Sequence, residues 1–173
     1  MKKPRIISFG EVLWDLFPDG GRFGGAPANF ACHAALQGAE VTICTAVGDD
    51  SYGDDAIRIL SEYDIDVSLV QTVATAPTGT ASVNLDDEGK PSFLFQDNSA
   101  WDQLQWTDDI ATKILSADAI CFGTLGQRSE MARQTTQRAL EVAGRAKIRR
   151  VVDINLRPPF FDAKIIRESI QLA

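Results

Sequence analysis

A glycine pair placed directly before an alanine-rich segment constrains this chain more than any other feature of its sequence. The stretch Phe23–Phe30 reads Phe-Gly-Gly-Ala-Pro-Ala-Asn-Phe. Gly24 and Gly25 lack side chains, as required where a backbone turns sharply or approaches a ligand closely. Pro27 suits the first turn of a helix, because an N–H group at that position would have no helical partner. The pattern predicts a glycine turn followed by a helix that ends at Gly38 with a left-handed cap.

The start of this helix is a candidate binding place. The first N–H groups of a helix have no partner within it, and bare backbone beside them lets a polar ligand approach. Asn29 would lie in the first turn, where its amide can both donate and accept hydrogen bonds, as a sugar hydroxyl requires. An ordinary strand–helix turn with an asparagine near its cap would show the same pattern, so the motif alone leaves both interpretations open.

Short apolar runs alternate with amphipathic segments through most of the chain. Strands are expected at 5–10, 41–47, 67–70, 119–122 and 151–155, and helices at 27–38, from Ser51, at 108–116, 129–147 and 164–172. This alternation predicts a parallel sheet with right-handed crossovers and helices on both faces. Thr107 is the expected cap of the helix at 108–116.

A cluster of aspartates follows the strand at 41–47. Four acidic residues so close together could suggest a metal site: Asp49, Asp50, Asp54 and Asp55. We favour helix capping, because acids are expected in a first helical turn and Ser51 with Asp54 matches a capping box.

Two segments, about 12–25 and 78–96, depart from the alternation of strand and helix. In Thr80–Leu85 polar and apolar residues alternate, which is typical of a strand with one exposed face. Pro91–Gln96 can pair with it across a turn at 86–89. Such two-faced strands predict a small sheet that stands apart from the main domain.

Asp15 lies in the first of these two segments. It shares one face of the strand at 12–17 with apolar neighbours, because side chains alternate across a strand. A carboxylate in such a strand is costly to bury without a partner. Asp15 must therefore face a polar ligand or pair within the protein.

Composition excludes several classes of protein. The chain has 173 residues, the size of one domain, and a formal net charge of −7. An acidic balance disfavours nucleic-acid binding, and no apolar run approaches the length of a membrane span. The three cysteines show no zinc or redox spacing, so we expect reduced thiols, no metal site, and a cytoplasmic protein.

Three motifs resemble the N-terminal half of the ribokinase-like (PfkB) carbohydrate kinases, and of the fructokinase type in particular. They are GEVLWDLFP at 10–18, GGAPANFA at 24–31 and AVGDDSYG at 46–53. The resemblance runs from about Ile6 to about Pro158. It implies an α/β fold, a ribokinase-like three-layer parallel sheet that is partial here, with a small β lid. Residues 1–173 would form the N-terminal part of a PfkB-type kinase domain, with lid strands at about 12–25 and 78–96.

The resemblance also implies roles for individual residues. It assigns the sugar site to Asp15, Gly24, Gly25, Asn29, Phe95 and Gln127, with Arg128 beside Gln127 at the rim. A carboxylate such as that of Asp15 can accept hydrogen bonds from two neighbouring hydroxyls at once. Asn155 and Arg157 would lie near the nucleotide phosphates, where the guanidinium could form a two-pronged contact.

The lid strands of this family cover the sugar and often form a dimer contact. The resemblance therefore implies a possible homodimer through the lid. Phe93 and Phe95 would pack over the ligand or against a partner's lid, and ordinary core packing is the alternative.

A second signature of the resembled family does not occur in these residues. The family takes its catalytic base from the aspartate of a Gly-Ala-Gly-Asp motif and builds most of its adenine pocket there, and this sequence contains no such motif. It contains no Walker-type phosphate loop either. We therefore expect no catalytic base in this chain, with ATP and Mg²⁺ belonging to the full-length protein. A strand at 151–155 without further neighbours would expose an apolar edge and favour self-association.

The expected function is ATP-dependent phosphorylation of a sugar hydroxyl by a fructokinase-like protein of which this chain is a part. Kinases for 2-keto-3-deoxygluconate, ribose or nucleosides are rivals within the same fold, because small pocket changes set substrate choice. A non-catalytic sugar-binding or dimerisation module is a rival of another class. A Rossmann dehydrogenase fits poorly, because the first strand leads to no G-x-G-x-x-G.

Overall fold

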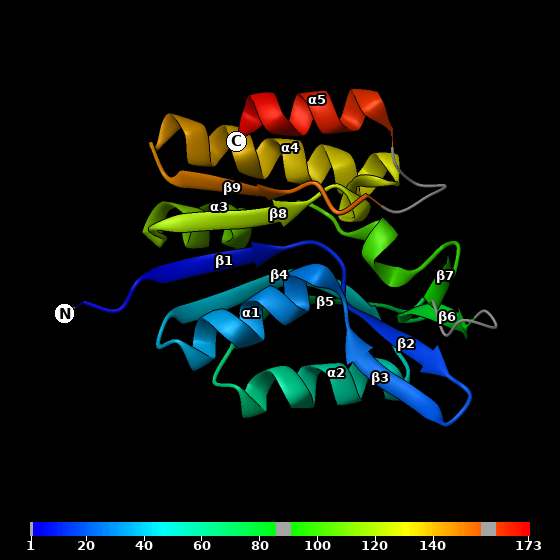
Figure 1. Cartoon of the computed structure of the whole chain (residues 1–173). Helices are drawn as coiled ribbons and strands as arrows, with labels where there is room; N and C mark the ends of the chain where they lie inside the picture. Colours follow the sequence, from blue (N-terminus) through cyan, green and yellow to red (C-terminus); the bar gives the residue numbers. More distant parts are fainter. Residues whose placement is uncertain (1, 86–90, 157–161) are drawn as a thin grey trace.

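Two β-sheets organise the chain, one parallel and one mixed (Figure 1). The computed structural model describes residues 2–85, 91–156 and 162–173. The main sheet has the order β5-β4-β1-β8-β9, with β5 at Asp66–Val73, β4 at Glu40–Gly48, β1 at Arg5–Phe9, β8 at Ala119–Gly123 and β9 at Arg149–Asp153. The second sheet, called the small sheet below, has the order β3-β2-β6-β7, with β3 at Gly20–Gly24, β2 at Leu13–Phe17, β6 at Gly79–Leu85 and β7 at Pro91–Phe95.

Helices cover both faces of the main sheet. On one face lie α1 (Ala26–Leu36) and α2 (Ser51–Glu62), and on the other lie α3 (Asp108–Ser116) and α4 (Glu130–Arg145). Helix α5 (Ala163–Leu172) packs against α4. Two short 3₁₀ helices follow strands: η1 (Ala100–Gln103) lies between β7 and α3, and η2 (Leu125–Gln127) lies between β8 and α4. The predicted three-layer α/β arrangement is confirmed.

Alternation of side chains across the main sheet builds two cores. Ile7 and Phe9 of β1 face α3 and α4, and Ile43 of β4 faces α1 and α2. On the α1 side the small residues Ala28 and Ala31 are completely buried, which lets the helix lie close to the strands. Burial of each large apolar side chain contributes about 1.5–3 kcal/mol, so the two cores provide the main stabilisation of the fold.

Several helix ends follow the sequence prediction. Thr107 caps α3 as predicted, by accepting a hydrogen bond from the amide three residues on. Ser129, predicted as the first residue of the helix at 129–147, is instead the cap of α4 and accepts in the same way. Gly38 follows α1 with a φ of 89°, the left-handed conformation expected for a glycine after a helix. Strand β9 begins two residues earlier than predicted and ends at Asp153, because pairing with β8 brings Arg149 and Arg150 into the sheet.

The cap of α2 differs from the prediction. The N-terminal cap is Asp50, whose Oδ1 accepts from the Gly53 amide at 2.9 Å, so the expected capping box of Ser51 and Asp54 is wrong. Asp50 lies one residue earlier and also accepts from the amide and hydroxyl of Thr78, at 2.8 and 2.7 Å. This carboxylate therefore ties the end of β4 and the start of α2 to the segment that leads into β6.

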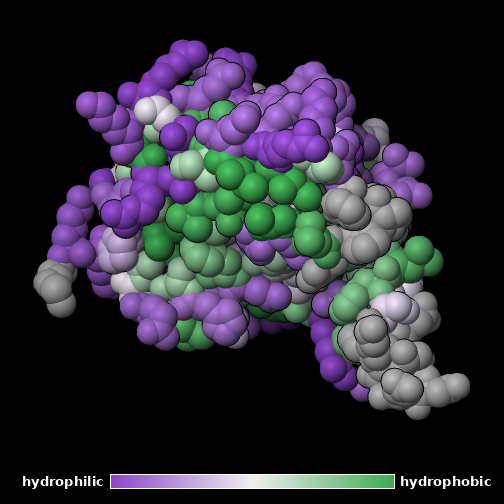
Figure 2. All heavy atoms as spheres, turned by 45° about the horizontal axis from the view of Figure 1, so that its top comes forward, coloured by the Kyte–Doolittle hydropathy of each residue, from purple (hydrophilic) through white to green (hydrophobic). Residues whose placement is uncertain are grey.

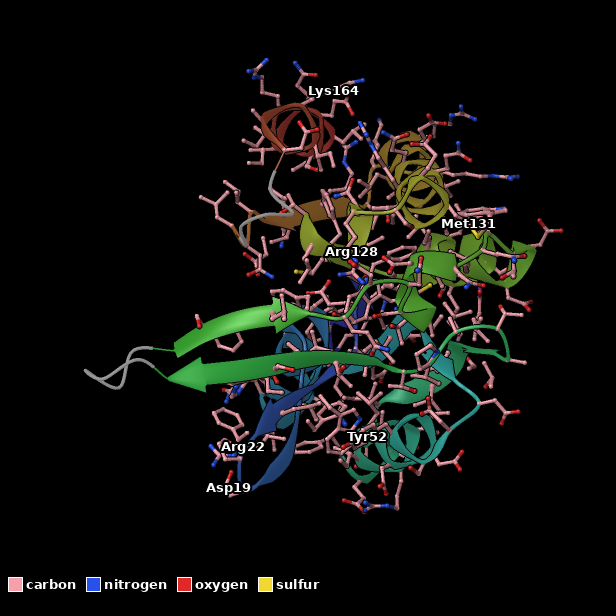
Figure 3. The ribbon with its side chains drawn as sticks, turned by 90° about the vertical axis from the view of Figure 1, so that its right-hand side faces the viewer. Asp19, Arg22, Tyr52, Arg128, Met131 and Lys164 are labelled. Carbon is pink, nitrogen blue, oxygen red and sulfur yellow. The ribbon has the colours of Figure 1, made fainter. Side chains whose placement is uncertain are left out.

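Buried contacts also hold the small sheet to the main domain. Trp14 of β2 stacks on Tyr52 of α2 with ring centroids 5.1 Å apart, and its indole N–H donates to the Tyr52 carbonyl at 3.0 Å. The Arg128 guanidinium donates to both carboxylate oxygens of Asp102, at 2.8 and 2.7 Å, and to the Gln96 carbonyl after β7 at 2.6 Å. Figure 3 shows Arg128 between the small sheet and the helices of the main domain.

We expect Arg128→Ala to lower the free energy of unfolding by about 3–5 kcal/mol, because it leaves the buried Asp102 carboxylate without its cation. Arg58→Ala is the matched control. Arg58 pairs with Asp55 and Glu62 on the exposed face of α2, and such pairs contribute about 0–1 kcal/mol. Urea denaturation measures both variants. Equal losses would contradict the role assigned to Arg128.

A second expectation concerns pH. Burial raises the pKa of the Asp50 carboxyl, but hydrogen bonds from Thr78 and Gly53 outweigh this and hold the pKa below its ordinary value. The charged form thus stabilises the folded state above about pH 4, and this contribution is lost as pH falls through the lowered pKa.

We therefore expect Asp50→Asn to cost about 1–2 kcal/mol of unfolding free energy at pH 7, and the difference from the parent to shrink as pH falls through the lowered pKa of Asp50. Asp49→Asn is the control, since the Asp49 side chain is exposed, and its effect should stay within about 0.5 kcal/mol. Urea denaturation at each pH measures the difference. A constant difference at all pH values would show that the charge of Asp50 plays no part.

Candidate functional site

A cavity of about 140 Å³ lies where the small sheet meets the carboxyl ends of the main strands. Its lining residues are Glu11, Leu13, Asp15, Gly25, Ala26, Asn29, Phe93, Phe95, Leu125 and Asn155. Glu11 follows β1 and Asn155 follows β9, while the other residues come from the small sheet, α1 and η2. Open α/β sheets bind ligands at this edge, because the loops that follow parallel strands gather there.

A larger cavity of about 450 Å³ lies at the opposite end of the strands. Three of its charged side chains already have partners: Lys113 pairs with Asp66 at 2.5 Å, and Arg5 pairs with Asp118 beside the cavity at 3.6 Å. The cavity at the carboxyl ends is the better candidate, because it combines carboxylates, an amide side chain and a helix N-terminus.

The structure brings most of the predicted site residues together. Asp15, Gly25, Asn29, Phe95 and Asn155 all line the cavity. Phe95 also belongs to a small core, as the core-packing alternative expects, while its packing over a ligand stays a prediction. Phe93, two residues earlier in the same strand β7, is 38% exposed.

Gly24 lies directly beside this group. A Cβ atom on Gly24 would come within 2.9 Å of the Asp15 Oδ2 atom, so glycine leaves room for the carboxylate. Gly24 and Asp15 lie close together because Gly24 pairs with Leu13 in the β2–β3 ladder, and Leu13 is two residues before Asp15 in β2.

Gln127 and Arg128 are not among the lining residues of this cavity. The Gln127 amide is buried and donates to the Gly123 carbonyl at 2.9 Å and to the Ser169 hydroxyl at 3.0 Å, so it joins η2 to α5. Arg128 pairs with Asp102 instead. Arg157 lies outside the described residues.

Sequence reasoning missed Glu11. This residue is completely buried at the cavity wall, and a Cβ on Gly126 would come within 3.1 Å of its Oε2 atom. Its signal was an acidic residue directly after the apolar first strand, a place where a ligand or a buried partner is needed. The cavity therefore has two carboxylates, those of Glu11 and Asp15.

The start of α1 forms one wall of the cavity. Gly25 is its N-terminal cap with a φ of 103°, and the helix has neither a side-chain cap nor an acid in its first turn. Ala26 and Asn29 of that turn line the cavity, so the positive end of the helix dipole faces the two carboxylates. This combination of acceptors and donors suits a neutral ligand rich in hydroxyl groups.

Asn155 completes the cavity from the main sheet. It has a φ of 38°, a left-handed conformation that asparagine adopts more readily than most residues. Its backbone N–H donates to the Asp153 Oδ1 atom at 3.0 Å, which holds the turn after β9 in place.

Metal-binding clusters and reactive thiols are both absent near the cavity, as far as residues 2–85, 91–156 and 162–173 are concerned. No group of three His, Cys, Asp or Glu side chains there could hold a metal ion. Burial, together with the charge of Asp153, raises the pKa of the nearby Cys121 thiol to about 11, so it stays protonated at neutral pH. No helix in these ranges is long and apolar enough to cross a membrane.

We expect Gly25→Ala to destabilise the protein more than Gly20→Ala. Both glycines have a positive φ, but a Cβ on Gly25 would lie 2.7 Å from the Glu11 carbonyl oxygen, whereas a Cβ on Gly20 would meet nothing within 4 Å. Both variants should cost about 1–3 kcal/mol for backbone strain, and Gly25→Ala more because of the clash. Urea denaturation measures the difference, and equal losses would show that the backbone at Gly25 moves freely.

Comparison with known proteins identifies relatives of this chain. The family description "pfkB family carbohydrate kinase" matches residues 20–173. Probable fructokinase-2 of Arabidopsis thaliana is 30% identical over 92% of this chain and 52% of its own length. Fructokinase of Klebsiella pneumoniae is 30% identical over 98% of this chain and 57% of its own length. The chain thus spans about half the length of the curated relatives it matches.

Solved structures share the fold. An uncharacterized sugar kinase from Pyrococcus horikoshii in complex with ATP superimposes with a TM-score of 0.85 and 28% identity, over 97% of this chain and 61% of that protein. Fructokinase from Xylella fastidiosa superimposes with a TM-score of 0.86 and 24% identity, over 99% of this chain and 58% of that protein. The fold, the cavity at the carboxyl ends of the strands and the match over residues 20–173 together show that this chain belongs to the pfkB family of carbohydrate kinases.

Proposed function

We propose that the full-length protein is an ATP-dependent sugar kinase of the fructokinase type, and that this chain supplies the sugar-binding part of its active site. The supporting observation is the cavity that joins Asp15, Asn29 and the N-terminus of α1 beneath the small sheet. The fructokinases among the relatives of this chain make a ketohexose the first substrate to test.

The lining of the cavity favours a sugar over an anionic ligand. Asp15 can accept hydrogen bonds from two neighbouring hydroxyls, and Asn29 can donate to a third or accept from it. Phe95 offers an apolar surface to the carbon skeleton of the sugar. In this proposal the small sheet, with strands in about 12–25 and 78–96, acts as a lid over the ligand, and residues 1–173 form the N-terminal part of the kinase domain.

The nucleotide would approach from the end of β9. Asn155 lines the cavity there and its side-chain amide can donate to a phosphate oxygen, and Arg157 follows two residues later. ATP would supply the phosphoryl group. We assign neither the Mg²⁺ site nor the catalytic base to the described residues of this chain, because they contain no metal-binding cluster and the chain contains no Gly-Ala-Gly-Asp.

A non-catalytic sugar-binding or dimerisation module remains the second candidate. It is favoured by the same absence of the Gly-Ala-Gly-Asp motif. A phosphotransfer assay separates the two, because the module transfers no phosphate in any form, whereas the kinase proposal predicts turnover once the remainder of the protein is present. A cytoplasmic location and a lack of nucleic-acid partners stay predictions from the reduced cysteines and the acidic charge.

Calorimetric titration of this chain with fructose tests the proposal. We expect binding, and we expect Asp15→Ala to weaken it at least about tenfold, because a charge-assisted hydrogen bond contributes roughly 1.5–3 kcal/mol. Asp19→Ala is the matched control. Asp19 is an aspartate at the exposed tip of the β2–β3 hairpin, 73% exposed, and its removal should leave binding unchanged (Figure 3).

Two outcomes would contradict the proposal. Equal effects of the two substitutions would mean that fructose binds outside this cavity. An absence of binding to fructose, ribose and 2-keto-3-deoxygluconate, in a sample shown to be folded by circular dichroism, would mean that the chain lacks a competent sugar site.

A further inference from the structure

Arg22 lies directly opposite Asp15 in the small sheet. The antiparallel pairing of β2 with β3 places these two residues side by side. The same row continues through Ala81 of β6 to Phe95 of β7. Directly opposed side chains lie on the same face of a sheet, and in an antiparallel pair their Cβ atoms are about 4.5–5.5 Å apart. Asp15 and Phe95 line the cavity, so Arg22 projects from the face of the small sheet that borders the cavity.

The contacts of the Arg22 guanidinium agree with this orientation. Its Cζ atom lies 4.1 Å from the centre of the Phe17 ring, and Phe17 shares one face of β2 with Asp15. Its Nη2 atom pairs with Asp19 of the hairpin turn at 3.2 Å, and Figure 3 shows the two side chains next to each other. The guanidinium therefore lies on the cavity side of the small sheet, beyond Asp15 and toward the tip of the hairpin.

Both contacts hold the guanidinium weakly. The side chains of Arg22 and Asp19 are 61% and 73% exposed, and exposed ion pairs and exposed cation–ring contacts are both weak. Figure 2 shows apolar and hydrophilic side chains next to one another on the part of the small sheet that projects from the main domain. An arginine side chain has several rotatable bonds, so the guanidinium can turn from Phe17 toward Asp15 while the backbone stays in place.

A hydroxyl group held by Asp15 can use a donor at this position. Among the described residues that line the cavity, the charged groups are the carboxylates of Glu11 and Asp15, which accept hydrogen bonds. A sugar hydroxyl that donates to Asp15 keeps its oxygen lone pairs, and these can accept a hydrogen bond in turn. Arg22 presents five N–H donors in a planar group, and its backbone lies directly beside that of Asp15. The two side chains together can satisfy both the donor and the acceptor of one hydroxyl.

We propose that Arg22 is a further sugar-binding residue, whose guanidinium turns toward the cavity when a sugar is bound and donates to a hydroxyl that Asp15 holds. This inference rests on the proposed function, because it takes a sugar as the ligand of the cavity. The contact joins the edge strand β3 to the ligand, so it draws the β2–β3 side of the small sheet over the sugar. The exposed pair with Asp19 is weak, so its loss costs little and Asp19→Ala stays a control for fructose binding.

Calorimetric titration with fructose tests this role through two matched substitutions. Arg22→Ala should weaken fructose binding about fivefold, the loss expected for one hydrogen bond. Arg58→Ala is the control and should leave binding unchanged. Arg58 is 58% exposed and pairs with an aspartate three residues earlier, as Arg22 does, but it lies on α2 and does not line the cavity. Arg22→Gln keeps an N–H donor on a shorter side chain and should retain part of the affinity.

Two further measurements separate a direct contact from a structural effect. In the Asp15→Ala background the additional loss on Arg22→Ala should fall below about twofold, because residues that share one hydroxyl are coupled. In ¹⁵N-labelled parent protein the Nε–H resonance of Arg22, assigned by its loss in Arg22→Gln, should shift when fructose is added. The same resonance should stay in place when fructose is added to Asp15→Ala.

The failure of this inference differs from the failure of the proposed function. The role of Arg22 is overturned, and the sugar site is kept, if Asp15→Ala weakens fructose binding while Arg22→Ala binds as the parent does. An Arg22 Nε–H resonance that bound fructose leaves unshifted has the same meaning, and it needs no folded Arg22→Ala variant. An absence of binding by the folded parent to fructose, ribose and 2-keto-3-deoxygluconate overturns the proposed function and this inference with it.

Discussion

The close approach of two backbones at Gly25 is the constraint on which the site depends. A Cβ atom there would lie 2.7 Å from the Glu11 carbonyl oxygen, so α1 can begin at this point only without a side chain. Through this contact the end of β1 and the start of α1 form adjoining walls of one cavity. Glu11 and Asp15 are thereby held near the positive end of the helix, where a hydroxyl-rich ligand finds acceptors and donors together.

The small sheet is attached to the main domain at one end, and its other end extends away from that domain. Trp14 against Tyr52, Asp50 with Thr78, and Arg128 with Gln96 all lie where the small sheet joins the main domain. Beyond these contacts, the strands project away from the main domain and are held mainly by one another (Figure 3). In the proposed function, this arrangement would let the small sheet act as a lid over a ligand in the cavity.

Sequence reasoning succeeded where a single local pattern carries the information. The glycine turn, the helix that ends before Gly38, the cap at Thr107 and the alternating strand that contains Ala81 could all be predicted in this way. It failed where two local solutions compete. At α2 both Asp50 and Ser51 could act as the cap, and the aspartate prevails because Thr78, 28 residues away, also donates to it. Gln127 could not be assigned either, because its partner Ser169 is 42 residues away.

The sequence by itself determined the order of strands and helices along the chain, the parallel sheet, the family and most of the predicted residues that line the candidate cavity. These properties follow from periodicity and from motifs whose parts lie close together in the chain. The tertiary structure alone decided that Glu11 is a wall of the cavity, that Arg128 is a buried anchor, and that Gln127 joins η2 to α5. Each of these properties depends on which segments of the chain contact one another in the folded protein. Those contacts determine which side chains are buried and which charges pair.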